Sequence, residues 1–133
     1  MLKKPITYTD YNGNQRTENF WFGLDEAEIL EFQMSYPGGM TAMLEKMIEE
    51  EDGAAILATI KKVIMMAYGE KSVDGKYFKK SQEMSEAFTH TRAYSVLLME
   101  LYSGGAADFM NKIIPQVPDQ PNGNPNSNVV VAQ

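Results

Sequence analysis

Hydrophobic and polar positions follow two different spacings along this chain of 133 residues. Between residues 5 and 23, β-forming residues lie on both sides of the polar segment Tyr11–Asn14. This segment contains an Asn-Gly pair, and such a pair between two β-forming runs is a strong signal for a hairpin turn. We therefore predict a β-hairpin over residues 5–23.

The register of the hairpin can be predicted from the face that each side chain would occupy. A two-residue loop, Asn12-Gly13, would place Ile6 opposite Asn19. A three-residue loop that also includes Asn14 would place Ile6 opposite Phe20. The longer loop gathers four large side chains on one face: Ile6, Tyr8, Phe20 and Phe22. Because a single buried face fixes register, we prefer the longer loop.

From residue 24 to residue 114 the apolar spacing becomes that of amphipathic helices, and we predict about five of them. Asp25 and Glu28 have the spacing of a capping box at the start of the first helix. The predicted helices contain Asp25–Ser35, Met40–Ile48, Ile56–Tyr68, Ser81–Tyr102 and Phe109–Ile114. The fourth is either one long helix or two shorter helices broken near residues 89–91. A polar loop with a turn at Asp74-Gly75 precedes it.

The chain ends in a segment rich in Pro, Asn and Gln, residues 115–133. Such a segment buries too little apolar surface to offset the entropy of ordering, so we predict a disordered polar tail. The predicted fold class is therefore mainly α, with an N-terminal β-hairpin followed by a helical bundle. We expect a single domain over residues 1–114, with the hairpin at 5–23 and the helices at 24–114.

The composition of the chain disfavours several classes of function. The chain has 18 acidic and 12 basic residues, and its net charge of -6 disfavours contact with nucleic-acid phosphates. No stretch approaches the roughly 20 apolar residues that cross a bilayer. Pro5 and the polar run Thr7–Asp10 stand where a signal peptide would need an apolar segment. The absence of Cys fits a reducing compartment. We expect a cytoplasmic protein that binds neither nucleic acid nor membrane.

Candidate catalytic residues are sparse. Gly69–Ser72 partly matches a phosphate-binding loop, but Glu70 stands where that loop needs Gly. Glu86 and His90 are four residues apart and could supply half of a metal site, although the chain has no second His. The four acids Glu49–Asp52 would point in different directions on a helix. We therefore expect no enzyme activity, no cofactor and no bound metal.

Methionine and tryptophan supply the candidate partner-binding residues. Eight of the ten methionines lie on predicted helices: Met40, Met43, Met47, Met65, Met66, Met84, Met99 and Met110. Methionine adapts to irregular surfaces, so this stripe is either core or a surface that also repacks on a partner. We choose Met40, Met43 and Met47 as exposed candidates. If Phe20 and Phe22 face the helices, Trp21 points away from them and could anchor an interface, unless a helix or the tail covers it.

Several segments carry a resemblance when taken together: Lys4–Asn14, Glu18–Leu24, Ala67–Ser72, Asp74-Gly75, Phe78–Glu83, Ala87-Phe88, Ala93-Tyr94, Leu101 and Ile113–Pro115. As an ensemble they resemble the tail assembly chaperones of long-tailed bacteriophages, the siphoviruses. The resemblance covers about residues 3–115 and includes no catalytic motif.

The resemblance implies a protein similar to the lambda tail protein G, which acts with a longer frameshifted form that shares its N-terminal domain. Such chaperones bind the tape measure protein in the host bacterial cytoplasm. They keep it soluble while the tail tube polymerises around it, and they are absent from the finished virion. Homo-oligomers are a further possibility under this interpretation. Two alternatives are a structural tail-completion or connector subunit that the particle retains, and a small enzyme or metal protein that uses Glu86 and His90.

Overall fold

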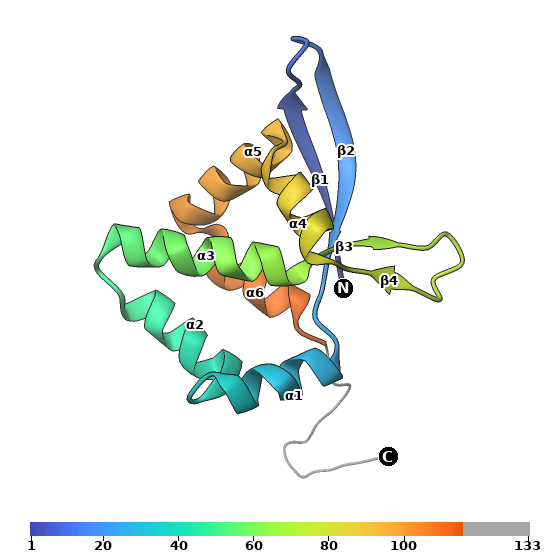
Figure 1. The fold of residues 1–133 in the computed structure, drawn as a ribbon. Helices are drawn as coiled ribbons and strands as arrows, with labels where there is room; N and C mark the ends of the chain where they lie inside the picture. The colour runs from blue at the N-terminus through green and yellow to red at the C-terminus, as the bar shows by residue number, and fades with distance from the viewer. Residues whose placement is uncertain (116–133) are drawn as a thin grey trace.

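The computed structural model describes residues 1–115, which form a four-stranded antiparallel sheet with helices packed on one of its faces (Figure 1). The sheet order is β1-β2-β3-β4. The elements are β1 (Leu2–Thr9), β2 (Gln15–Phe22), α1 (Glu26–Ser35), α2 (Gly39–Glu49), α3 (Gly53–Ala67), β3 (Tyr68–Lys71), β4 (Phe78–Lys79), α4 (Gln82–Thr89), α5 (Arg92–Glu100), the π-helical turn η1 (Leu101–Gly105) and α6 (Ala106–Ile113). The predicted hairpin and helical bundle are confirmed, but two strands were missed. Apart from Pro115, the predicted tail lies outside the described residues.

The register of the β1–β2 hairpin differs from both sequence-based alternatives. Ile6 lies opposite Glu18, whereas the preferred register placed Phe20 there and the other placed Asn19. The error relative to the preferred register is two residues, and a shift of two leaves every side chain on its face. The predicted inner face is therefore confirmed, because Ile6, Tyr8, Phe20 and Phe22 all contact the core.

The loop of this hairpin explains the shift. It has three residues, as predicted, but they are residues 11–13 and not residues 12–14. The Asp10 N–H donates to the Asn14 carbonyl at 2.8 Å, which closes the loop one residue earlier. Gly13, with φ of 86°, occupies the left-handed position that ends a loop of this kind. The Asp10 carboxylate also accepts hydrogen bonds from the N–H groups of Asn12 and Asn14.

The missed strands follow α3 directly. We expected the third helix to run to Tyr68 and a polar loop to follow, but Tyr68 begins β3 and Gly69 lies in that strand opposite Trp21. A Cβ at Gly69 would lie 2.8 Å from a ring carbon of Phe78, so glycine permits this close contact. The predicted turn at Asp74-Gly75 is confirmed, and it connects β3 to β4.

Local helix signals are largely confirmed. Asp25 and Glu28 form the predicted capping box at the start of α1. Asp52 caps the start of α3, where its side chain accepts the N–H of Ala54. The open choice between one long helix and two is resolved, since α4 and α5 are separate and Thr91 caps α5.

Aromatic residues join the sheet to the helices. Phe22 is completely buried, and its ring centroid lies 5.3 Å from that of Phe109 in α6. Tyr68 in β3 stacks on Phe88 in α4 at 4.3 Å. These contacts fix one core between the inner face of the sheet and the bundle, and they leave the outer face of the sheet for other contacts.

Candidate partner-binding surface

The three methionines proposed as exposed candidates are buried. Met40, Met43 and Met47 expose 6%, 2% and 8% of their surface, and all three belong to the core cluster. The spacing of these residues forms a single stripe, and α2 turns that stripe toward α6. The prediction of exposure is therefore wrong for all three, and for these three methionines the core alternative is correct. The longer methionine stripe is mixed, because Met110 is also buried whereas Met99 is 70% exposed. In this arrangement they present almost no area to a partner.

Trp21 lies on the outer face of the sheet, as predicted. Its strand neighbours Phe20 and Phe22 contact the core, so its ring points away from the helices. The ring is only half-buried, and two ammonium groups cover part of it. The Nζ atoms of Lys3 and Lys71 lie 5.8 Å and 5.2 Å from the ring centroid. A partner-binding role for Trp21 remains a prediction.

An apolar groove lies between the start of α3 and the end of α5, and we call it the α3–α5 groove. Its volume is about 430 Å³. Its lining residues are Gly53, Ala54, Leu57, Leu98, Met99 and Tyr102. Met99 is 70% exposed and Tyr102 is 49% exposed. This groove offers flexible and aromatic side chains on a surface that no described element covers.

The groove has a specific local origin. Gly53 begins α3, and a Cβ there would lie 2.5 Å from the Tyr102 hydroxyl. The absence of a side chain at Gly53 therefore lets the Tyr102 ring lie against the first turn of α3. Leu57 and Leu98 are half-buried and contribute apolar side chains to the lining of the groove.

Sequence reasoning missed the groove, although one signal was present. Helix α3 has more apolar positions than one buried stripe needs, and such a helix has a second apolar face. Ile60, Val63 and Ile64 fill the buried face, whereas Leu57 contributes to the groove. The partner of that second face cannot be read from spacing, because α5 is about 40 residues away in the sequence.

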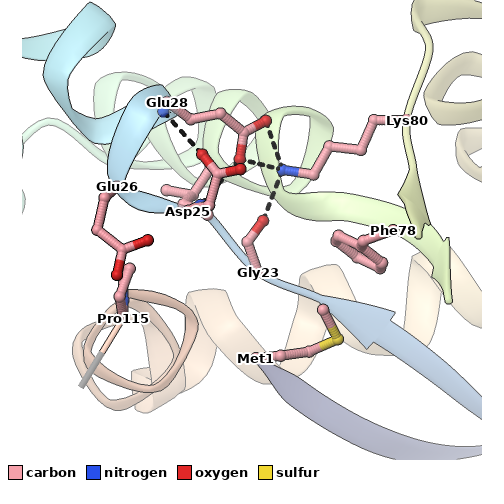
Figure 2. A pocket seen from close by; sticks show the side chains of 9 residues that line it. Met1, Gly23, Asp25, Glu26, Glu28, Phe78, Lys80 and Pro115 are labelled. Atoms are coloured by element: carbon pink, nitrogen blue, oxygen red, sulfur yellow. Dashed lines mark hydrogen bonds and ion pairs between the residues drawn. The ribbon is translucent and has the colours of Figure 1, made fainter. Parts of the chain in front are cut away.

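A second pocket, of about 460 Å³, lies where α1 meets the end of the sheet (Figure 2). The Lys80 ammonium donates to the carbonyl of Gly23 at 2.6 Å and to the carbonyl of Met66 at 3.0 Å. It also donates to both carboxylate oxygens of Glu28 at 2.9 Å. All its hydrogens therefore have partners, so Lys80 ties three segments together and is not available to hold a ligand.

The two segments that suggested a phosphate-binding loop and a metal site do not have the geometry that those sites need. Gly69–Ser72 lies in β3 and the following turn, and it does not lead into a helix as a phosphate-binding loop must. Glu86 and His90 are both exposed at the end of α4. Among residues 1–115, no group of three or more His, Asp or Glu side chains is placed to hold a metal ion. None of the helices described is long and apolar enough to cross a bilayer.

Comparison with known families agrees with the resemblance seen in the sequence. A family model for the phage tail assembly chaperone matches residues 1–120. The chain belongs to this family. The match covers the hairpin, the bundle and the α3–α5 groove of the chaperone. Comparisons with curated proteins and with solved structures each gave no match.

Proposed function

We propose that this chaperone binds the tape measure protein of a long-tailed phage and keeps it soluble until the tail tube encloses it. The proposed role is non-enzymatic, is performed in the host cytoplasm and leaves the chaperone outside the finished virion. A longer frameshifted form and further copies of the chain are proposed co-partners. The observation that carries the proposal is the exposed α3–α5 groove.

The chemistry of the groove suits such a client. A long helical protein that exposes apolar stripes tends to aggregate until another surface covers them. An amphipathic helix can place its apolar side chains in a groove of another protein. Met99 can adapt to different client side chains, and Tyr102 combines a large apolar ring with a polar end. Many weak contacts along one client would add up through avidity.

Co-expression tests this proposal. The tape measure protein is produced alone and with the chaperone, and its soluble fraction is measured. We expect the chaperone to move most of the client into the soluble fraction and to co-purify with it. An unchanged soluble fraction would refute the proposal.

The alternative is a structural tail-completion or connector subunit that the particle retains. Strand β1 is an edge of the sheet, and a neighbour could add a strand there. However, β1 carries Lys3, Lys4 and Pro5, which are residue types that oppose strand addition at an edge. Mass spectrometry of purified virions separates the two roles, because a structural subunit is retained and the chaperone is not.

A further inference from the structure

Four consecutive acids, Glu49–Asp52, run from the last residue of α2 to the residue before α3, and we call this segment the acidic corner. Gly53 and Ala54, which line the α3–α5 groove, follow it directly. Between residues 45 and 57 the chain carries five acidic residues and one basic residue, Lys46. On the opposite wall, Glu100 follows Met99, but the Lys4 ammonium, 2.8 Å away, neutralises its carboxylate, so the unpaired negative charge near the groove belongs to the acidic corner. The groove therefore begins beside an excess of negative charge.

Two acids of the corner have local structural roles. The Glu50 carboxylate accepts the backbone N–H groups of Glu51 and Asp52, each at 3.1 Å. The Asp52 carboxylate accepts the N–H of Ala54 at 3.0 Å and caps α3. These bonds account for Glu50 and Asp52 without any partner.

The other two acids have no such role. The side chains of Glu49 and Glu51 are exposed and make no hydrogen bond or ion pair within residues 1–115. Glu49 also ends α2, where its charge opposes the helix dipole, and it lies one turn from Glu45. Local stability therefore does not account for the negative charge at these two positions.

We propose that the groove takes a cationic amphipathic helix of the tape measure protein, with Lys or Arg side chains flanking its apolar stripe. The apolar stripe enters the groove, and the flanking cations lie on Glu49 and Glu51. This inference rests on the proposed function, since it specifies the client segment for the same groove. Exposed ion pairs of this kind change affinity by about threefold each, so two of them give roughly tenfold.

Synthetic helical peptides test the inference with the full-length chaperone. Three peptides share one apolar stripe and differ only in flanking residues, which are Lys, Gln or Glu. Fluorescence anisotropy gives the Kd of each. We expect the Lys-flanked peptide to bind roughly tenfold tighter than the Glu-flanked peptide at low salt, and we expect high salt to reduce this preference.

Two double variants that each remove two negative charges test whether the acidic corner causes the preference for Lys-flanked peptides. The double variant Glu49→Gln, Glu51→Gln should lose most of the preference for Lys flanks and keep its affinity for the Gln-flanked peptide. The control Glu31→Gln, Glu86→Gln removes the same charge from exposed positions on α1 and α4 and should keep the preference.

Several outcomes would overturn the inference: equal affinity for the three peptides, tighter binding of the Glu-flanked peptide, binding of no peptide, or an unchanged preference in the Glu49, Glu51 variant. The proposed function is tested separately by client solubility. A client that stays soluble without any charge preference would refute the inference alone.

Discussion

Lys80 illustrates how one side chain can hold together segments that are far apart in the sequence. Its ammonium joins the β2–α1 connection to the start of α1 (Figure 2). It also donates to the Met66 carbonyl at the end of α3. The side chain is only 18% exposed, so water replaces these hydrogen bonds poorly when they are lost. The spacing of apolar residues gave no sign of this role.

Replacing Lys80 with Met should lower the free energy of unfolding by about 2 to 3 kcal/mol, because two carbonyls and the Glu28 carboxylate lose their donor. Urea denaturation of the purified protein measures the change. Lys79→Met, at the exposed neighbouring position, is the control and should change the free energy by less than about 0.5 kcal/mol. Equal effects of the two substitutions would show that the Lys80 contacts do not stabilise the fold.

Asp10 makes the hairpin sensitive to acid. The Arg16 guanidinium, bonded at 2.6 Å, and the backbone N–H of Asn14 hold the pKa of Asp10 below its ordinary value of 3.8. A carboxylate whose pKa is lowered in the folded state contributes stability above its unfolded pKa. That contribution is lost as the pH falls through the lower folded value.

Asp10→Asn should therefore reduce the loss of stability that acid causes below about pH 4. The measurement is the urea midpoint of both proteins at neutral pH and at several pH values down to about 2. Above pH 5 the variant should be the less stable of the two. Parallel pH curves for the two proteins would contradict the assignment.

At the scale of elements, signals within a few residues were predictable. The capping box of α1 and the Asp74-Gly75 turn depend on adjacent residues, and both formed where the sequence placed them. Strand β3 was not predictable, because its four residues have no alternation and become a strand by pairing with β2. The hairpin register depended on which residue takes the left-handed conformation, and Gly13 takes it rather than Asn14.

Gly104 provides a test at this scale. It lies inside η1, two residues before α6, with φ of 136°, and a Cβ there would meet nothing within 4 Å. The cost of Gly104→Ala is therefore backbone strain alone, and we expect a loss of about 1 to 2 kcal/mol in the free energy of unfolding. Ser103→Ala, in the same turn, should be nearly neutral. A neutral Gly104→Ala would show that the chain can turn into α6 with another conformation.

At the scale of the whole molecule, the fold class and the inner face of the hairpin followed from the sequence, whereas the division between core and surface did not. In the sequence, the spacing of Met40, Met43 and Met47 is compatible with either a core or an interface. In the structure these side chains are buried in the core. Met99 is 70% exposed and lines the α3–α5 groove together with residues at the start of α3. Such contacts join residues far apart in the chain, and local spacing does not encode them.

The central claim is that the α3–α5 groove holds the client, and the affinity of a Met99 variant tests it most directly. Met99→Gln keeps the size of the side chain and removes its apolar character, while Val73→Gln makes a comparable change at an exposed turn far from the groove. The Kd for the purified tape measure protein is measured for both variants. We predict roughly tenfold weaker binding for Met99→Gln, about 1.4 kcal/mol, and unchanged binding for Val73→Gln. Unchanged binding by Met99→Gln, in a protein of unaltered stability, would contradict the account.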